Sequence, residues 1–150
     1  MSHKLYYEDM NLGDKRRSVE YHLSEQEIIA MASKWDPQPI HIDPGFAAQT
    51  AIGSVFASSV HLVGIMVKLL NESWESMATI AGLGWDEVRF VSPGLPGSYL
   101  HVESEVISKR ESNSNPDAGI VTTMMKLLNQ HDEPVLVFEG SVLIGKRPRQ

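Results

Sequence analysis

The chain has 150 residues, of which 42% are hydrophobic and 21% charged, a balance that excludes a disordered polymer and allows one buried core. Its formal net charge of −6 argues against a nucleic-acid partner, because such binding depends on neutralising phosphates. The absence of cysteine excludes disulfides, thiolate nucleophiles and cysteine-based zinc sites. We therefore expect one soluble, cytoplasmic domain over residues 1–150, with no signal peptide and no membrane-spanning segment.

The first elements in chain order are a strand and a helix. Residues 17–23 alternate weakly between polar and apolar, which predicts a strand. Ser24, with Glu27 three residues later, forms the capping-box pattern that opens a helix. The apolar positions that follow at helical spacing predict one buried face: Ile28, Met31, Ala32 and Trp35.

Two prolines end this helix and a second, short helix follows. Pro37 and Pro39 stop the first helix, because proline donates no backbone hydrogen bond and crowds the preceding turn. Asp43 stands before Pro44 and is expected to cap the short helix that begins there.

Residues 58–77 predict a long helix at the centre of the fold. One apolar stripe follows the helical period: Val60, Val63, Val67, Leu70, Trp74 and Met77. Further apolar residues fill much of the remaining surface of its first half: Leu62, Ile65, Met66 and Leu69. We therefore expect this helix to be covered on most sides.

The second half of the chain predicts four antiparallel strands. Residues 80–91, 99–109, 119–130 and 134–145 are rich in Val, Leu and Ile and are separated by Pro-, Gly- and Asn-rich turns. A strand, then helices, then four strands is an α+β order, and a sheet curled around the long helix is its simplest packing. Exposed sheet edges would favour a homodimer or larger homo-oligomer.

The densest polar cluster is the segment WDPQPIHID, residues 35–43. Asp36 and His41 are five residues apart across two prolines, which restrict the loop and can hold both side chains towards one water molecule as a general acid/base pair. From spacing alone, a loop-capping Asp36 and a buried structural His41 remain the alternative. A metal site of Asp36, His41 and Asp43 is disfavoured, because the ligands are few and Asp43 serves as a helix cap.

The stretch WDPQPIHIDPGFAAQTAIGSVFASSVHL resembles the signature of MaoC-like acyl dehydratases and (R)-specific enoyl-CoA hydratases, which have the hot-dog fold. The later stretch WDEVRFVSPGLPGSYLHVESEV resembles a second block that is common among hot-dog proteins. Together the resemblance runs from about residue 7 to residue 145. It implies an antiparallel sheet around a central helix and a lyase of acyl-CoA and fatty acid metabolism.

The resemblance also implies roles for three residues. Asp36 and His41 correspond to the pair that handles the water added to a 2-enoyl thioester, or lost in the reverse reaction. The backbone N–H of Ser59, eighteen residues after His41, corresponds to the donor that polarises the thioester carbonyl, and a helix N-terminus suits that task. The family usually has glycine at this position, so the Ser58–Ser59 pair is a departure that puts full activity in question.

Cofactors, partners and rival functions follow from the same resemblance. We expect no metal or redox cofactor, and coenzyme A or a carrier pantetheine enters as part of the acyl-thioester substrate; no residue is assigned to its phosphates.

His61 is expected to be a buried histidine bonded to a neighbour, with a place in the acyl pocket as the alternative, and His3, His22, His101 and His131 receive no role. A hot-dog thioesterase and a non-catalytic acyl-CoA-binding or partner subunit remain the rival functions.

Overall fold

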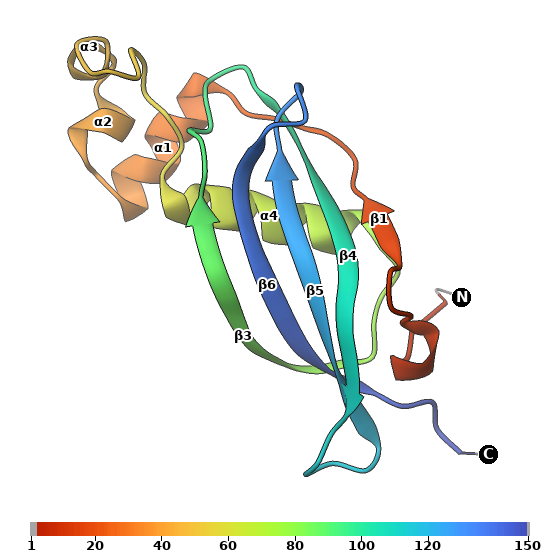
Figure 1. The fold of residues 1–150 in the computed structure, drawn as a ribbon. Coiled ribbons are helices and arrows are strands. Elements are labelled where there is room, and N and C mark those ends of the chain that lie inside the picture. Colours follow the sequence, from red (N-terminus) through yellow and green to blue (C-terminus); the bar gives the residue numbers. More distant parts are fainter. Residues whose placement is uncertain (1–2, 150) are drawn as a thin grey trace.

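The computed structural model describes residues 3–149 and is built on an antiparallel sheet that curves around one long helix (Figure 1). In chain order the strands are β1 (Lys15–Arg17), β2 (Tyr21–His22), β3 (Thr79–Phe90), β4 (Tyr99–Glu111), β5 (Ala118–Leu128) and β6 (Pro134–Gly145). The helices are the short 3-10 helix η1 (Tyr7–Asp9), α1 (Glu25–Trp35), α2 (Pro39–Ile42), α3 (Pro44–Ala47) and α4 (Ser59–Ser73). The α+β order expected from the sequence is confirmed.

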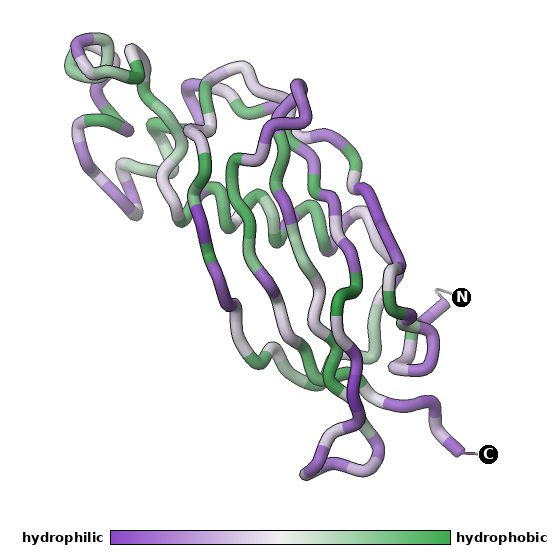
Figure 2. Tube along the Cα trace, in the orientation of Figure 1, coloured by the Kyte–Doolittle hydropathy of each residue, from purple (hydrophilic) through white to green (hydrophobic). Residues whose placement is uncertain are grey.

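The sheet order is β1-β4-β5-β6-β3, and β2 pairs with β4 beside this path. All of these named pairs are antiparallel. The four strands predicted in the second half are confirmed, with ends that shift by one or two residues. The polar segment between β4 and β5 is a hairpin loop at the far tip of the sheet, drawn in purple in Figure 2.

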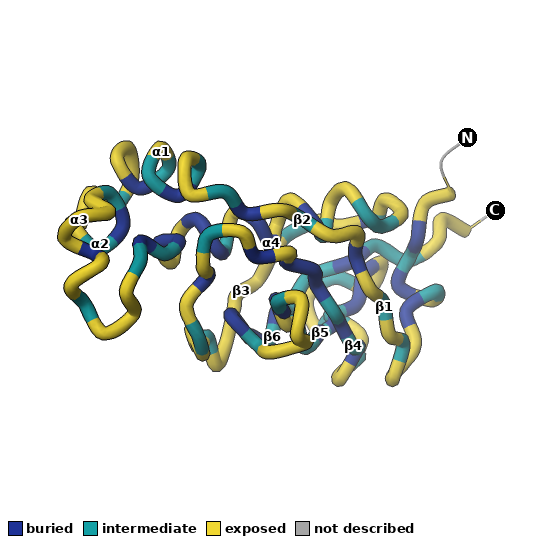
Figure 3. Tube along the Cα trace, turned by 90° about the horizontal axis from the view of Figure 1, so that it is seen from above, coloured by how far each residue is buried: buried dark blue, intermediate teal, exposed yellow. Residues whose placement is uncertain are grey.

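The core lies between α4 and the sheet. The buried face of α4 carries Leu62, Ile65, Met66 and Leu69, which meet inward-facing strand residues such as Phe138. Figure 3 shows dark blue segments of α4 beside the strands. The expectation that this helix is covered on most sides was wrong, because Val60 and Val67 are 47% and 39% exposed. Of the predicted stripe, Val63, Leu70 and Trp74 are partly buried against the core. Both faces of this helix are apolar, so the period alone did not determine which one meets the sheet.

Helices α1, α2 and α3 gather at one end of the molecule, away from both termini (Figure 1). The predicted cap of α1 is confirmed, since Ser24 Oγ accepts a hydrogen bond from the Glu27 amide at 3.2 Å. The second half of the capping box is wrong, because the Glu27 carboxylate turns towards Tyr21 and His61 instead. Trp35, expected on the buried face, is 62% exposed.

Two elements have other boundaries than predicted, because segments that are distant in sequence bond to the chain at those points. The single strand over residues 17–23 is two short strands, separated where Ser18 exchanges two hydrogen bonds with the backbone of Val102, at 2.9 and 2.8 Å. The long helix ends at Ser73, not Met77. Beyond it, the N-terminal residue Leu5 bonds to the backbone of Ser76 and Ala78, which draws the chain into extended structure. Within residues 3–149, no helix is both long and apolar enough to span a bilayer.

Candidate active site

The segment after α1 forms a compact turn that carries both predicted side chains. The Asp36 amide still bonds to the last turn of α1 through Ala32 O, at 2.8 Å. Pro39 then begins α2, a single turn that the sequence did not predict. Proline suits the first helical position, because a backbone N–H there has no acceptor within the helix and its absence costs nothing. The amide of His41 bonds to Gln38 O at 2.9 Å, so the turn places His41 beside Asp36.

The orientation of His41 is fixed by a backbone carbonyl. Its Nδ1 lies 2.7 Å from the oxygen of Phe56, and a carbonyl can only accept, so Nδ1 carries the hydrogen. In the neutral ring Nε2 therefore holds a free lone pair, and it lies 3.5 Å from Asp36 Oδ2. The Phe56 ring also contacts the imidazole edge-on, with centroids 4.7 Å apart. His41 is 4% exposed, and these two contacts hold its ring in this orientation.

Asp36 is oriented by a neighbour within the same loop. Gln38 Nε2 donates a hydrogen bond of 2.8 Å to Asp36 Oδ1, which leaves Oδ2 directed to His41. The Asp36 side chain is 23% exposed, so solvent or substrate can reach it. The two acceptor atoms, Asp36 Oδ2 and His41 Nε2, can thus share one water molecule that donates a hydrogen to each.

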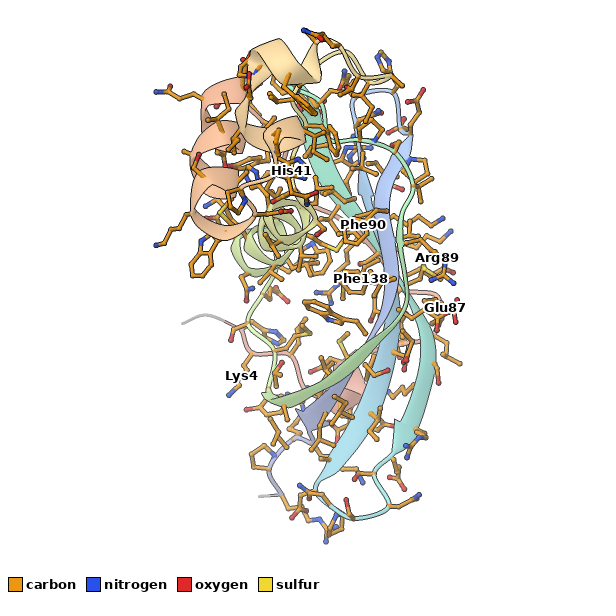
Figure 4. All side chains as sticks on the ribbon, turned by 90° about the vertical axis from the view of Figure 1, so that its left-hand side faces the viewer. Lys4, His41, Glu87, Arg89, Phe90 and Phe138 are labelled. Carbon is orange, nitrogen blue, oxygen red and sulfur yellow. The ribbon has the colours of Figure 1, made fainter. Side chains whose placement is uncertain are left out.

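Both side chains line a pocket of about 410 Å³ that also includes Ser59. Its other walls are largely apolar and come from four parts of the chain: Gln38, then Ile52, Phe56 and Ala57, then Leu62, and finally Phe90, Val91, Ser92 and Pro93. Figure 4 shows His41 and Phe90 at the same end of the molecule, beside α4 seen end-on. An apolar pocket with a few polar atoms at one place is the usual form of a small-molecule site.

Ser59 is the first residue of α4, and its backbone N–H has no acceptor within that helix. Ser58 caps the helix, with its Oγ accepting from the His61 amide at 3.4 Å. Ser58 is fully buried, whereas Ser59 is exposed at the edge of the pocket. The three residues predicted as the site are therefore brought together by the fold.

A second polar network supports the first turn of α4. His61 Nε2 lies 3.0 Å from Glu27 Oε1, and the hydroxyl of Tyr21 donates to the same oxygen. His61 is 4% exposed and does not line the pocket, which agrees with a buried histidine bonded to a neighbour. Burial, followed by the hydrogen bond to Glu27, raises the pKa of Tyr21. This network joins α1 to the start of α4.

Sequence reasoning missed two groups of residues at the site. Gln38 and Phe56 orient the predicted pair, and Gln38 could have been found because it lies inside the Asp36–His41 loop. Residues 90–93 close the pocket from the end of β3. They lie inside the second stretch that resembles hot-dog proteins, but that resemblance assigned them no role. Asp43 caps α3 by accepting from the Phe46 amide at 3.0 Å, as predicted.

Comparison with known proteins identifies the family. The MaoC like domain family matches residues 9–126. A MaoC-like dehydratase from Rhodospirillum rubrum has a structure with a TM-score of 0.89 and 34% identity, covering 97% of this chain and 99% of that one. An (R)-hydratase from A. caviae involved in PHA biosynthesis gives a TM-score of 0.72 at 27% identity, covering 93% and 98%. A Mycobacterium tuberculosis protein with a double hotdog fold, at 20% identity, has a TM-score of 0.75 and is matched over 45% of its length.

Two further proteins are similar to this chain in sequence. An uncharacterised Bacillus subtilis protein, YdeM, is 29% identical over 142 residues, which are 93% of this chain and 98% of the relative. A mesaconyl-CoA hydratase from Cereibacter sphaeroides is 40% identical over 72 residues, which are 48% of this chain but only 21% of that enzyme. The predicted hot-dog fold is confirmed, and the family resemblance with it.

Proposed function

We propose that this chain, which belongs to the MaoC-like domain family, catalyses the reversible addition of water to a 2-enoyl thioester. The observation that carries the proposal is the pair of hydrogen-bond acceptors, Asp36 Oδ2 and His41 Nε2, 3.5 Å apart in the pocket that Ser59 borders. Coenzyme A or a carrier pantetheine is part of the substrate, and the chemistry needs no metal or redox cofactor.

Water activation follows from the two acceptors. A water molecule that donates to both atoms directs its oxygen lone pair away from them, towards C3 of an enoyl group in the pocket. As the oxygen bonds to C3, one proton of the water passes to the acceptor pair. A proton is returned to C2, so that H and OH add across the double bond and the atoms balance. Loss of water from a 3-hydroxyacyl thioester is the same path in reverse.

The electrons of the double bond move towards the thioester carbonyl during this addition. The carbonyl oxygen gains negative charge, and the Ser59 N–H at the start of α4 is suited to stabilise it. The apolar walls, which include Ile52, Phe56 and Phe90, suit the acyl chain. Ser59 is exposed and borders the pocket, as an oxyanion donor that must reach the substrate would.

A homodimer is the second part of the proposal. Strand β3 ends the sheet order within residues 3–149, and it exposes apolar side chains there, with Ile80, Leu83 and Trp85 between 51% and 54% exposed. A second copy would cover this edge. Light scattering after gel filtration should give twice the chain mass, and Leu83→Lys should shift the species towards one chain.

The activity test uses crotonyl-CoA, a longer 2-enoyl-CoA and mesaconyl-CoA, with loss of enoyl absorbance and release of free thiol followed together. Asp36→Asn and His41→Ala should each lower kcat/KM about 100-fold or more, as expected for losing a general acid/base group. The matched control is Lys34→Ala, an exposed residue near the end of α1 that does not line the pocket.

Three results would contradict the proposal. Release of free thiol equal to the loss of enoyl-thioester absorbance would indicate a thioesterase, because hydrolysis of the thioester also removes that absorbance. Tight binding of enoyl thioesters by the folded wild type, without turnover of any of the three, would indicate a binding subunit. Full activity in both variants would remove Asp36 and His41 from the chemistry.

A further inference from the structure

A third buried histidine lies outside the proposed active site. His101, on β4, is 1% exposed. Within residues 3–149, neither of its ring nitrogens has a hydrogen-bond partner. Buried polar groups almost always have partners, and His41 and His61 each have one. His101 therefore needs another explanation.

Two carboxylates face the Nε2 atom of His101. Glu103 Oε1 is 3.6 Å away and Asp132 Oδ1 is 3.5 Å away. The ligand atoms of the three residues all lie within 4.8 Å of one another. His101 and Glu103 are two residues apart on β4, so they lie on one face of the sheet, and Asp132 arrives from the turn between β5 and β6. Both distances are longer than a hydrogen bond.

The turn that carries Asp132 is held by its own hydrogen bonds. Asn129 accepts from the Asp132 amide through its backbone oxygen at 3.0 Å, and its side-chain oxygen accepts from the amides of His131 and Glu133 at 2.9 and 3.1 Å. Asp132 itself has φ of 57°, a left-handed conformation that Asp and Asn tolerate better than most residues. The turn thus holds the Asp132 carboxylate beside His101 without using it as a turn acceptor.

We propose that His101, Glu103 and Asp132 form a binding site for Zn²⁺ or a chemically similar divalent transition-metal ion. With zinc–ligand bonds of about 2.1 Å, tetrahedral ligands lie about 3.4 Å apart, close to the two distances observed. An octahedral Mg²⁺ with bonds of about 2.1 Å needs neighbouring ligands about 3.0 Å apart and prefers oxygen. Imidazole with two carboxylates is a zinc ligand set, and water would take the fourth position.

The surroundings allow a cation to enter but set a limit on its affinity. Glu103 and Asp132 border a surface depression of about 520 Å³, which gives an entry path. Two carboxylates balance the charge of the ion. Arg17 Nη1 lies 3.4 Å from Glu103 Oε1, and Lys126 is opposite Glu103 in the sheet, so both oppose a second positive charge. A bound ion would tie the β5–β6 turn to β4 and give His101 its missing partner.

The competing explanation is a protonated His101 held between two carboxylates, with no metal. The test is calorimetric titration of Zn²⁺ into chelator-treated protein that carries no histidine tag, with Co²⁺ absorption as the probe of tetrahedral geometry. We expect one ion per chain and a tetrahedral Co²⁺ spectrum. Asp132→Asn, which suits the left-handed backbone, and Glu103→Gln should each weaken binding at least tenfold.

Two control variants test whether Zn²⁺ binds at this site and not at other carboxylates. Glu105→Gln changes a carboxylate on the same strand and face that belongs to an ion pair with Lys15, and it should bind Zn²⁺ like the wild type. Asp36→Asn should also bind normally, because the proposed catalytic pocket is a different site. No stoichiometric binding, or equal binding in the wild type, Asp132→Asn and Glu103→Gln, would overturn the proposal. The thermal midpoint of each variant without metal shows that it is folded.

Discussion

The two segments that border the pocket contribute in different ways. The loop after α1 offers side chains, Asp36 and His41, whose orientations are fixed by Gln38 and by the carbonyl of Phe56. The start of α4 offers a backbone N–H at Ser59, whose position depends on the helix cap and on the Tyr21–Glu27–His61 network. The catalytic side chains thus come from one short loop that a carbonyl of a later segment braces, whereas the backbone donor depends on the packing of two helices.

The largest effect is expected when the backbone donor at Ser59 is removed while the Asp36 and His41 side chains are kept. Ser59→Pro deletes the N–H at the first helical position, where proline is well accepted. Ser58 has φ of −64° and ψ of 160°, the extended conformation that a residue before proline prefers. We expect kcat to fall about 100- to 1,000-fold, as for loss of an oxyanion donor. Ser59→Ala keeps the N–H and should stay within a few-fold of wild type in the enoyl-CoA assay.

The second prediction concerns the side-chain half of the site. Gln38→Ala removes the 2.8 Å hydrogen bond to Asp36 Oδ1, so the carboxylate loses its fixed orientation. A hydrogen bond to a charged group contributes about 1.5–3 kcal/mol, which corresponds to a loss of tenfold or more in kcat/KM. Steady-state kinetics check this value, and an unchanged pH profile with unchanged kcat would show that Gln38 does not position Asp36.

The third prediction compares two helix caps. Ser58→Ala and Ser24→Ala each remove a side-chain oxygen that accepts from the third residue of its helix. Each should lower the free energy of unfolding by about 1 kcal/mol in denaturant titrations. Only Ser58→Ala should also reduce kcat, because it loosens the turn that carries Ser59. Equal kcat values for the two variants would separate the cap of α4 from catalysis.

The smallest effect is confined to alkaline pH. The pKa of Tyr21 is raised in the folded protein, by burial and then by the Glu27 hydrogen bond, so the folded state holds this proton more tightly than the unfolded state. This contribution to the free energy of unfolding is fully present at pH values below about 10, the pKa of tyrosine in the unfolded chain, and it is lost as the pH rises above that value. Tyr21→Phe should flatten that decline in unfolding titrations. A smaller dependence should persist through Tyr7, whose pKa is also raised by burial.

Local patterns were sufficient where neighbours in sequence are also neighbours in space. The caps at Ser24 and Asp43 formed as expected, because the acceptor and the donor amide lie three residues apart. Strand β6 has the predicted ends, and the other three long strands differ by one or two residues. The short reach of the Asp36–His41 loop, reinforced by the family resemblance, similarly located the candidate site.

Distant contacts decided the features that the sequence missed. The end of α4 depends on Leu5, which pairs with residues that follow the helix, and the break between β1 and β2 depends on Ser18 bonding to Val102. The buried face of α4 was chosen by the sheet and not by the period, since both of its faces are apolar. The Glu27 carboxylate left its expected capping position because His61 and Tyr21 lie within its reach.

The sequence by itself determined the α+β order, the helix caps and the loop that presents Asp36 and His41, because each depends on contacts within a few residues. Only the tertiary structure decided that Ser59, Phe90 and the loop share one pocket, and that His101 meets the carboxylates of Glu103 and Asp132. Those groups are between two and about fifty residues apart and lie on separate elements or on one face of a sheet. The strand period places His101 and Glu103 on one face of the sheet, but no local pattern brings Asp132 to them or joins the segments of the pocket. The paths of segments that are distant in sequence decide those contacts.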